Sequence, residues 1–189
     1  MDNDDPLLIE QIRTRLLPRR GVWASEDEIL VTVGAQQALY MLAQLLLDKN
    51  STVGLETPGY VDIRNIVKLN PSQIKPIPVD QDGMVIGDHL KGCDLVYTTP
   101  SHQCPTTVTM PIERRYELLE QANKDDFIII EDDYESETNF ESHPIPALKS
   151  LDNNDRVIYI GSLSKTLAPG LRIGYLVGPA ELIREARAL

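Results

Sequence analysis

The feature that most constrains the fold is a set of short, continuous apolar runs in the last third of the chain. Residues 127–133 read FIIIEDD, residues 156–162 read RVIYIGS and residues 172–178 read RIGYLVG. Runs of this length are typical of strands buried on both faces in the centre of a parallel sheet. Helices cover both faces of such a sheet. The apolar runs therefore predict an α/β fold, a three-layer α/β/α sandwich with a mainly parallel central sheet.

Upstream of these runs, helical and strand-like patterns alternate. A proline in the first turn and a cap at Asp4 or Asp5 predict that the chain opens with a helix. Residues 25–28, SEDE, resemble a capping box, but a β-branched run follows them and we interpret them as a turn. The predicted helices are residues 6–19, 35–47, 60–68, 112–122 and 180–189, and the other predicted strands are residues 29–33, 52–56, 75–79 and 95–99. Since no repeat, low-complexity segment or clear linker interrupts this pattern, we expect one domain over residues 1–189.

Composition narrows the class of ligand. The chain has 189 residues, 42% of them hydrophobic, and a formal net charge of −11. An acidic surface repels nucleic acid phosphates and anionic lipid head groups, so we expect this chain to contact neither nucleic acid nor a membrane. Its ligands are expected to be small molecules or proteins.

The cysteines and the N-terminus favour a cytoplasmic location. Cys93 and Cys104 form no CxxC pair and have no histidines at metal-site spacing, so neither a disulfide framework nor a zinc site is indicated. The first residues, MDNDDPLL, are acidic where a secretory signal is basic, and no apolar run approaches the roughly 18 residues of a membrane span. We therefore expect no targeting segment and a reducing compartment.

Candidate site residues follow directly after the apolar runs. In open α/β sheets, ligands gather at the carboxyl ends of the strands, where loops and helix N-termini converge. The residues found there are Gly34, Ala35, Gln36, Tyr60, Ser101, His102, Asp132, Asp133, Tyr134, Ser162, Ser164 and Lys165.

Lys165 is an isolated lysine in the predicted turn after a buried strand, and this position indicates a chemical role. A lysine in a desolvated turn beside another cation, such as Arg172, can lose its proton and form a Schiff base. The hydroxyls of Ser162 and Ser164 and the Arg172 guanidinium are suited to a phosphate. The free backbone N–H groups of the helix that starts at Gly34 are suited to the same group. A phosphorylated aldehyde would satisfy both features.

Three further residues fit an aromatic ring that carries this aldehyde. Asp132 and Tyr134 are two residues apart, so in a strand their side chains lie on the same side. They offer a carboxylate to a protonated pyridine nitrogen and a phenol to a ring oxygen, while Tyr60 would lie flat on the ring. The ligand with these features is pyridoxal 5'-phosphate.

Taken together, these motifs resemble a known family. The stretches VGAQQAL (33–39), EDDYESE (131–137) and SLSKTLAPGLRIGYLVG (162–178) are similar to those of fold type I aminotransferases of class I and II. They are most similar to the aminotransferase-like domain of MocR-type transcriptional regulators of the GntR superfamily. The resemblance covers nearly the whole chain and implies the large, cofactor-binding domain of that fold.

The resemblance implies a role for each matching residue. Lys165 would form the Schiff base, Asp132 would partner the pyridine nitrogen, and Tyr134 would donate a hydrogen bond to the ring hydroxyl. Tyr60 would stack on the ring, and His102 would contact the cofactor. The phosphate would be held by Gly34, Ala35, Gln36, Ser162, Ser164 and Arg172.

The same resemblance leaves two functions open. One is amino-group transfer on an amino acid or amine, and the alternative is an effector-sensing domain of a transcriptional regulator with little or no turnover. Both imply a small-molecule amino acid or amine as ligand. The resemblance also implies a homodimer. Because little chain follows the last apolar run to cover the sheet, we expect this fragment itself to self-associate as a two-fold dimer through the face bearing Tyr60, residues 34–36 and the opening helix.

The chain departs from the family in two ways. Related regulators read Pro-Thr-Gly where this chain has Pro105-Thr106-Thr107, and a β-branched residue is unfavourable in such a turn if φ is positive. The family's N-terminal winged helix and C-terminal small domain are absent from this sequence. We therefore expect a fragment of the large domain that is inactive alone.

Plainer interpretations of these residues exist. Lys165 alone could be a solvated lysine, Tyr60 could be ordinary packing, and His102 could be merely hydrogen-bonded. An aspartate after a strand commonly caps a turn, which we favour for Asp133 but not for Asp132.

Two other kinds of site are disfavoured by the sequence. A nucleotide phosphate loop needs glycine at the positions of Ser164 and Tyr159. A metal site is disfavoured because alternating carboxylates on so acidic a chain usually form a solvated edge. The residues that this metal site would use are Asp132, Asp133, Glu135, Glu137, Glu141 and His143.

Overall fold

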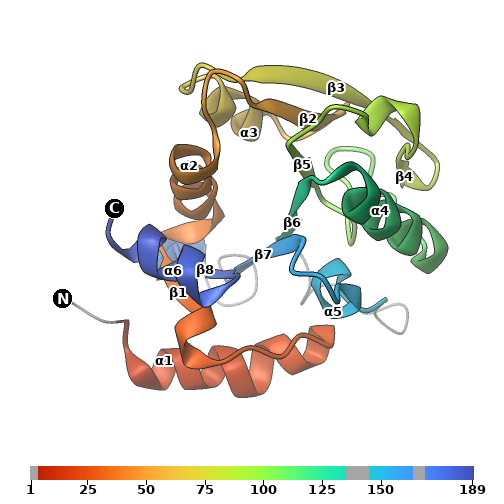
Figure 1. Ribbon diagram of the computed structural model, residues 1–189. Coiled ribbons are helices and arrows are strands. Elements are labelled where there is room, and N and C mark those ends of the chain that lie inside the picture. Colours follow the sequence, from red (N-terminus) through yellow and green to blue (C-terminus); the bar gives the residue numbers. More distant parts are fainter. Residues whose placement is uncertain (1–3, 135–144, 164–168) are drawn as a thin grey trace.

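The computed structural model describes residues 4–134, 145–163 and 169–189. Their centre is an eight-stranded sheet in the order β1-β8-β7-β6-β5-β2-β3-β4 (Figure 1). Strands β3, β2, β5, β6 and β7 are parallel to one another, whereas β8 runs antiparallel to β7 and β1, and β4 antiparallel to β3. The predicted mainly parallel sheet is confirmed. The strands are β1 (Ile29–Thr32), β2 (Thr52–Thr57), β3 (Gln73–Asp80), β4 (Gly83–Met84), β5 (Leu95–Thr98), β6 (Ile128–Asp133), β7 (Val157–Ser162) and β8 (Gly174–Val177).

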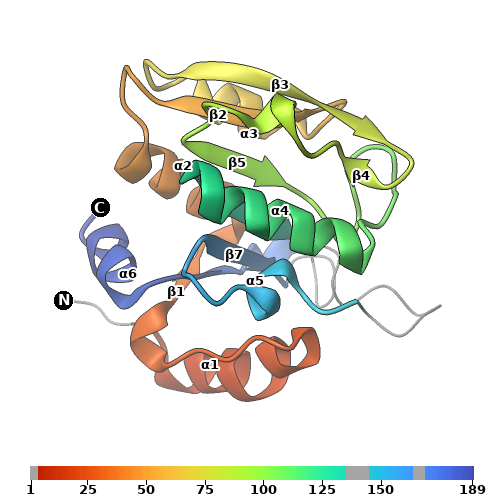
Figure 2. The same cartoon turned by 45° about the vertical axis from the view of Figure 1, so that its right-hand side comes forward.

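Helices cover both faces of this sheet. Figures 1 and 2 show α2, α3 and α6 on one side of the strands and α1, α4 and α5 on the other. Among the described residues, no helix combines the length and the apolar character that crossing a membrane requires. The helices are α1 (Pro6–Gln11), η1 (Ile12–Leu16), η2 (Leu17–Arg20), η3 (Glu26–Glu28), α2 (Gly34–Leu46), α3 (Val61–Val67), η4 (Asp88–Leu90), α4 (Ile112–Asp125), α5 (Leu148–Leu151), η5 (Pro169–Leu171) and α6 (Ala180–Arg187).

The period of two along each strand divides the core into two layers. On β6, Ile130 packs with the apolar residues of α2, α3 and α6, while its neighbour Ile129 packs with those of α4 and α5. On the same side as α4, Ile12 of η1 packs in a cluster with Tyr159 and Tyr175. The predicted α/β/α sandwich is therefore confirmed.

The opening helix occupies its predicted place but changes geometry along its length. The Asp5 carboxylate accepts hydrogen bonds from the N–H groups of Leu7 and Leu8 at 2.8 and 3.3 Å, so Asp5 is the cap. After α1, the chain continues through a π-helical turn, η1, and a 3₁₀ turn, η2, which ends at Arg20. This irregular end matters because it places Arg20 against β6.

Short elements that differ from the sequence-based expectation include η3, β4 and α5. Residues 26–28 form the 3₁₀ helix η3, and the Ser25 N–H donates to the Glu28 carboxylate at 2.7 Å. The capping box is real, so interpreting it as a plain turn was wrong. Strand β4 and helix α5 were not predicted, because elements of two and four residues are too short to show a periodic pattern.

Candidate functional site

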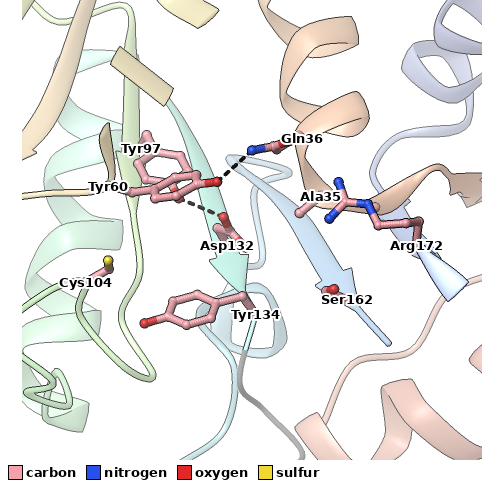
Figure 3. A pocket seen from close by; sticks show the side chains of 10 residues that line it. Ala35, Gln36, Tyr60, Tyr97, Cys104, Asp132, Tyr134, Ser162 and Arg172 are labelled. Carbon is pink, nitrogen blue, oxygen red and sulfur yellow. Dashed lines mark hydrogen bonds between the residues drawn. The ribbon is translucent and has the colours of Figure 1, made fainter. Parts of the chain in front are cut away.

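The carboxyl ends of β5, β6 and β7 meet the start of α2 at one cavity. Its volume is about 510 Å³, which lies within the range of small-molecule sites. Figure 3 shows three tyrosine rings gathered around Asp132, with Arg172 and Ser162 toward the other side. Of the predicted site residues that the structure describes, all but Ser101, His102 and Asp133 line this cavity. The lining residues are Gly34, Ala35, Gln36, Tyr60, Tyr97, Cys104, Asp132, Tyr134, Ser162 and Arg172.

Asp132 forms the acidic side of the cavity. It lies near the end of β6 and is 4% exposed. Tyr97, from the neighbouring strand β5, donates its hydroxyl to Oδ2 of Asp132 at 2.7 Å (Figure 3). Burial, followed by the charge of Asp132, raises the pKa of Tyr97 well above its usual value of 10. Tyr97 therefore keeps its proton and remains a hydrogen-bond donor to this carboxylate.

Tyr134 lies beside Asp132, as the period of two predicted. Its hydroxyl donates to the backbone carbonyl of His102 at 2.8 Å, and the two rings meet edge to face with centroids 6.1 Å apart. His102 is half-buried and does not line the cavity. The structure shows His102 in contact with Tyr134. A contact between His102 and a ligand remains a prediction.

Tyr60 is fixed by a triangle of hydrogen bonds at the start of α3. Its hydroxyl donates to the Asp62 carboxylate at 2.8 Å. It also accepts from the Gln36 amide at 3.0 Å, as Figure 3 shows. The Gln36 amide also reaches Asp62, at 2.6 Å. Burial is the main cause that raises the pKa of the Tyr60 phenol. The triangle ties the loop after β2 to the first turn of α2, so the Tyr60 ring has a defined place at the cavity.

Two glycines allow Arg172 and β8 to approach the start of α2. Gly34 has φ +75°, and a Cβ placed there would lie 3.3 Å from Nη2 of Arg172. A Cβ at Gly174 would lie only 2.6 Å from the carbonyl carbon of Gly34. Because the first turn of a helix has N–H groups without intrahelical partners and a positive dipole end, this corner is suited to an anion.

The residues predicted to be most reactive lie at the end of β7 and shortly after it in sequence. Ser162, the last residue of β7, lines the cavity. Ser164 and Lys165 follow it shortly in sequence and lie outside the described residues. Their assignment stays a prediction.

Asp133 does not cap a turn, and the sequence-based interpretation was wrong. Its side chain is fully buried on the face of β6 opposite to Asp132. Oδ2 of Asp133 accepts from Nε of Arg20 at 2.7 Å and from the hydroxyl of Tyr159 at 2.8 Å. No local pattern announces this ion pair, because Arg20 lies 113 positions earlier in the chain.

Glu131 lies on the same buried face as Asp133. Its two carboxylate oxygens accept from the N–H groups of Leu148 and Lys149, both at 2.8 Å, and Nη1 of Arg115 lies 3.8 Å away. Burial, followed by the negative charge of Asp133, raises the pKa of Glu131 to about 7. This face of β6 therefore carries a network of buried charges directly beneath the cavity.

The metal alternative gains no support from the part of the chain that the structure describes. Within that part, no group of three or more His, Cys, Asp or Glu side chains could hold a metal ion. Four residues of the alternative, Glu135, Glu137, Glu141 and His143, lie outside it.

Sequence reasoning missed two residues of the cavity, Tyr97 and Cys104. The sequence could have indicated Tyr97, since a tyrosine within an apolar buried strand needs a partner for its hydroxyl. It could not have indicated Cys104, because the position of Cys104 depends on the path of the loop after β5.

Comparison with known proteins identifies relatives over the whole length of the chain. The model of the family described as aminotransferase class I and II matches residues 5–189. The HTH-type transcriptional regulator TauR of Rhodobacter capsulatus is 46% identical over 188 residues, which cover 100% of this chain and 39% of that protein. The probable rhizopine catabolism regulatory protein MocR of Rhizobium meliloti is 38% identical over 178 residues, which cover 94% of this chain and 36% of that protein. The chain thus spans well under half the length of these relatives.

Solved structures agree with the family match. The crystal structure of an archaeal alanine:glyoxylate aminotransferase superposes with a TM-score of 0.90 at 35% identity. The superposition covers 96% of this chain and 47% of that one. The cavity described above therefore lies in the fold of an aminotransferase-like domain.

Proposed function

Because the chain belongs to the aminotransferase class I and II family, we propose that its cavity binds pyridoxal 5'-phosphate together with an amino acid or amine. The observation that carries this proposal is that one cavity is lined by a buried carboxylate, Asp132, and by a cation, Arg172. The cofactor has the complementary pair of groups, a basic ring nitrogen and a phosphate.

The corner at Gly34 would hold the phosphate. The Arg172 guanidinium lies against Gly34, and a planar guanidinium can donate two parallel hydrogen bonds to a phosphate. The backbone N–H groups of Ala35 and Gln36 in the first turn of α2 and the hydroxyl of Ser162 complete the donor set. All these groups donate hydrogen bonds, which is what an anionic ligand requires.

The opposite side would hold the ring. Asp132 would keep a proton on the pyridine nitrogen, and Tyr97 would orient the Asp132 carboxylate through its 2.7 Å hydrogen bond. Tyr60 would lie on one face of the ring. The Tyr134 hydroxyl donates its proton to the His102 carbonyl, so its oxygen would accept a hydrogen bond from the ring hydroxyl. When bound, pyridoxal phosphate supplies an electron sink for an amino acid, and a protonated ring nitrogen strengthens that sink. Lys165 would attach the cofactor covalently and move the proton at the α-carbon of the amino acid.

A reducible adduct tests the cofactor proposal. The chain is incubated with pyridoxal phosphate, reduced with borohydride and digested, and the modified peptide is identified by mass spectrometry. We expect the adduct on Lys165, its loss in Lys165→Ala, and no change in Lys124→Ala, an exposed lysine of α4. Labelling spread evenly over surface lysines, or an unlabelled Lys165, would refute the proposal.

For the full-length protein, we propose a transcriptional regulator that senses an amino acid or amine, because relatives at 46% and 38% identity are regulators. The second candidate is an aminotransferase, which is favoured by the 35% identity to the alanine:glyoxylate enzyme. Full-length protein loaded with cofactor and given an amino donor and a keto acid separates the two. A regulator changes its absorption spectrum with little turnover, whereas an enzyme releases the new amino acid repeatedly.

We also propose that the protein acts as a homodimer. Aminotransferase-like domains of this family are typically dimeric. On the surface beside Tyr60 and the start of α2, Val33 and Val61 are 62% and 66% exposed, which favours association there. Sedimentation of the full-length protein as a monomer at tens of micromolar would contradict this proposal.

A further inference from the structure

Arg20 makes side-chain hydrogen bonds to three separate segments of the chain. Its Nε donates to Asp133 at 2.7 Å, Nη1 to the carbonyl of Ile145 at 3.1 Å, and Nη2 to the hydroxyl of Ser101 at 2.8 Å. The residue is 5% exposed and does not line the cavity. A buried guanidinium that joins three segments fixes their relative positions, because its donors form a rigid planar fork.

Two of these segments meet again at Tyr134. Asp133 immediately precedes Tyr134, and Ser101 immediately precedes His102, whose carbonyl accepts the Tyr134 hydroxyl at 2.8 Å. The backbone of Tyr134 and the acceptor of its hydroxyl are therefore each one residue away from a group bound by Arg20. Movement of either segment would change where the Tyr134 phenol lies in the cavity.

We propose that Arg20 is a positioning residue for the cofactor cavity, which sets the place of Tyr134 by holding the end of β6 to the loop at Ser101. The inference rests on the proposed function only for the identity of the ligand. Arg20 itself touches no ligand and acts through Tyr134. A lysine at this position would keep a positive charge near Asp133, but its donors lie on one nitrogen and lack the planar fork of Nε, Nη1 and Nη2 with which Arg20 reaches the three segments.

Hydrogen–deuterium exchange of the cofactor-free chain tests the positioning directly. In Arg20→Lys, we expect faster exchange in peptides that cover residues 99–104 and 131–134. The matched control is Arg184→Lys, an exposed arginine of α6. Within the described part of the chain, its ion pairs are with the neighbouring Glu181 and Glu185, and its replacement should change neither peptide. Ser101→Ala removes one hydrogen bond of Arg20 without disturbing its pair with Asp133, and it should accelerate exchange in the first peptide. Unchanged exchange in folded Arg20→Lys would overturn the proposal.

Affinity for pyridoxal phosphate tests whether Arg20 acts through Tyr134. We expect Arg20→Lys and Tyr134→Phe each to raise the dissociation constant about threefold to tenfold. The dissociation constant of the double variant should equal that of the single variant that binds more weakly. Multiplied effects in the double variant would mean that Arg20 acts by another route and would overturn this step. If the unaltered chain binds no pyridoxal phosphate while Arg20→Lys changes the exchange, the proposed function fails and the positioning role stands.

Discussion

Thr107 is a strained residue whose replacement by glycine should stabilise the protein. The sequence pointed to this turn because a threonine stands where related regulators have glycine. In the structure, Thr107 has φ +67°, in the left-handed region that β-branched residues rarely adopt. The turn is nevertheless closed, since the Thr107 N–H donates to the carbonyl of Gln103 at 2.7 Å.

The size of the effect follows from two opposing contributions. Left-handed backbone costs an L-residue about 1–2 kcal/mol, and glycine removes this cost. Glycine in turn loses about 0.5–1 kcal/mol more conformational entropy on folding. The Thr107 side chain is exposed, so little burial is lost, and a glycine can form the same hydrogen bond to Gln103. We expect Thr107→Gly to raise the free energy of unfolding by about 0.5–1 kcal/mol, which corresponds to roughly 1–4 °C in Tm for a chain of this size.

Urea unfolding followed by circular dichroism measures this difference, and Thr106→Gly is the matched control. Thr106 donates both its N–H and its hydroxyl to the side-chain oxygen of Gln103, at 3.0 and 2.6 Å. Its replacement loses the hydroxyl bond and adds chain entropy, so it should destabilise by about 1–2 kcal/mol. If Thr107→Gly lowered the midpoint as Thr106→Gly does, the strain attributed to Thr107 would not exist.

Three other predictions concern the neighbouring strands. Asp132→Asn should weaken pyridoxal phosphate binding by roughly 1–3 kcal/mol with little change in stability, whereas Asp133→Asn should lower the free energy of unfolding by about 3–5 kcal/mol because it leaves a buried arginine without its counter-charge. Titration with cofactor and urea unfolding of both variants separate these effects, and equal losses of affinity would contradict the assignment. Tyr97→Phe removes the donor to Asp132 and should weaken cofactor binding by about 1–2 kcal/mol, measured by the same titration. Glu131 holds its proton more tightly when folded, so wild-type stability relative to Glu131→Gln should fall by up to about 3 kcal/mol as pH rises from about 4.5 to about 7, and a difference that is constant with pH would contradict this.

The sequence predicted those parts of the fold and of the site that depend on local pattern. Continuous apolar runs identified the central strands, because a strand buried on both faces leaves no polar position until it ends. The period of two then predicted that Asp132, in β6, and Tyr134, directly after it, face the same side, and both line the cavity. The break in the family pattern at Thr107 likewise predicted an unfavourable turn, because positive φ depends on the local backbone alone.

What the sequence could not predict depends on contacts between distant segments. Asp133 looked like a turn cap because its partner, Arg20, reaches it only after the opening helix has packed across the sheet. Tyr97 acquires its role from the pairing of β5 with β6, which sets Tyr97 opposite Ile130 and brings its hydroxyl to Asp132. Periodicity reports which face a residue occupies, but not which residue lies across from it.

Strand β6 carries one carboxylate that faces the cavity and two that face the buried layer beneath it. Asp132 faces the cavity, while Glu131 and Asp133 face a buried layer where their carboxylates meet Arg115 and Arg20. Buried charges of this kind give little net stability, since the cost of desolvation offsets their attraction. They do fix geometry, because each pair tolerates few arrangements. In the role proposed for Asp132, its carboxylate would meet a ring nitrogen within a few tenths of an ångström, and a rigid strand would favour that placement. The acidic residues on both sides of Asp132 are therefore best understood as the means by which the fold holds that one carboxylate in place.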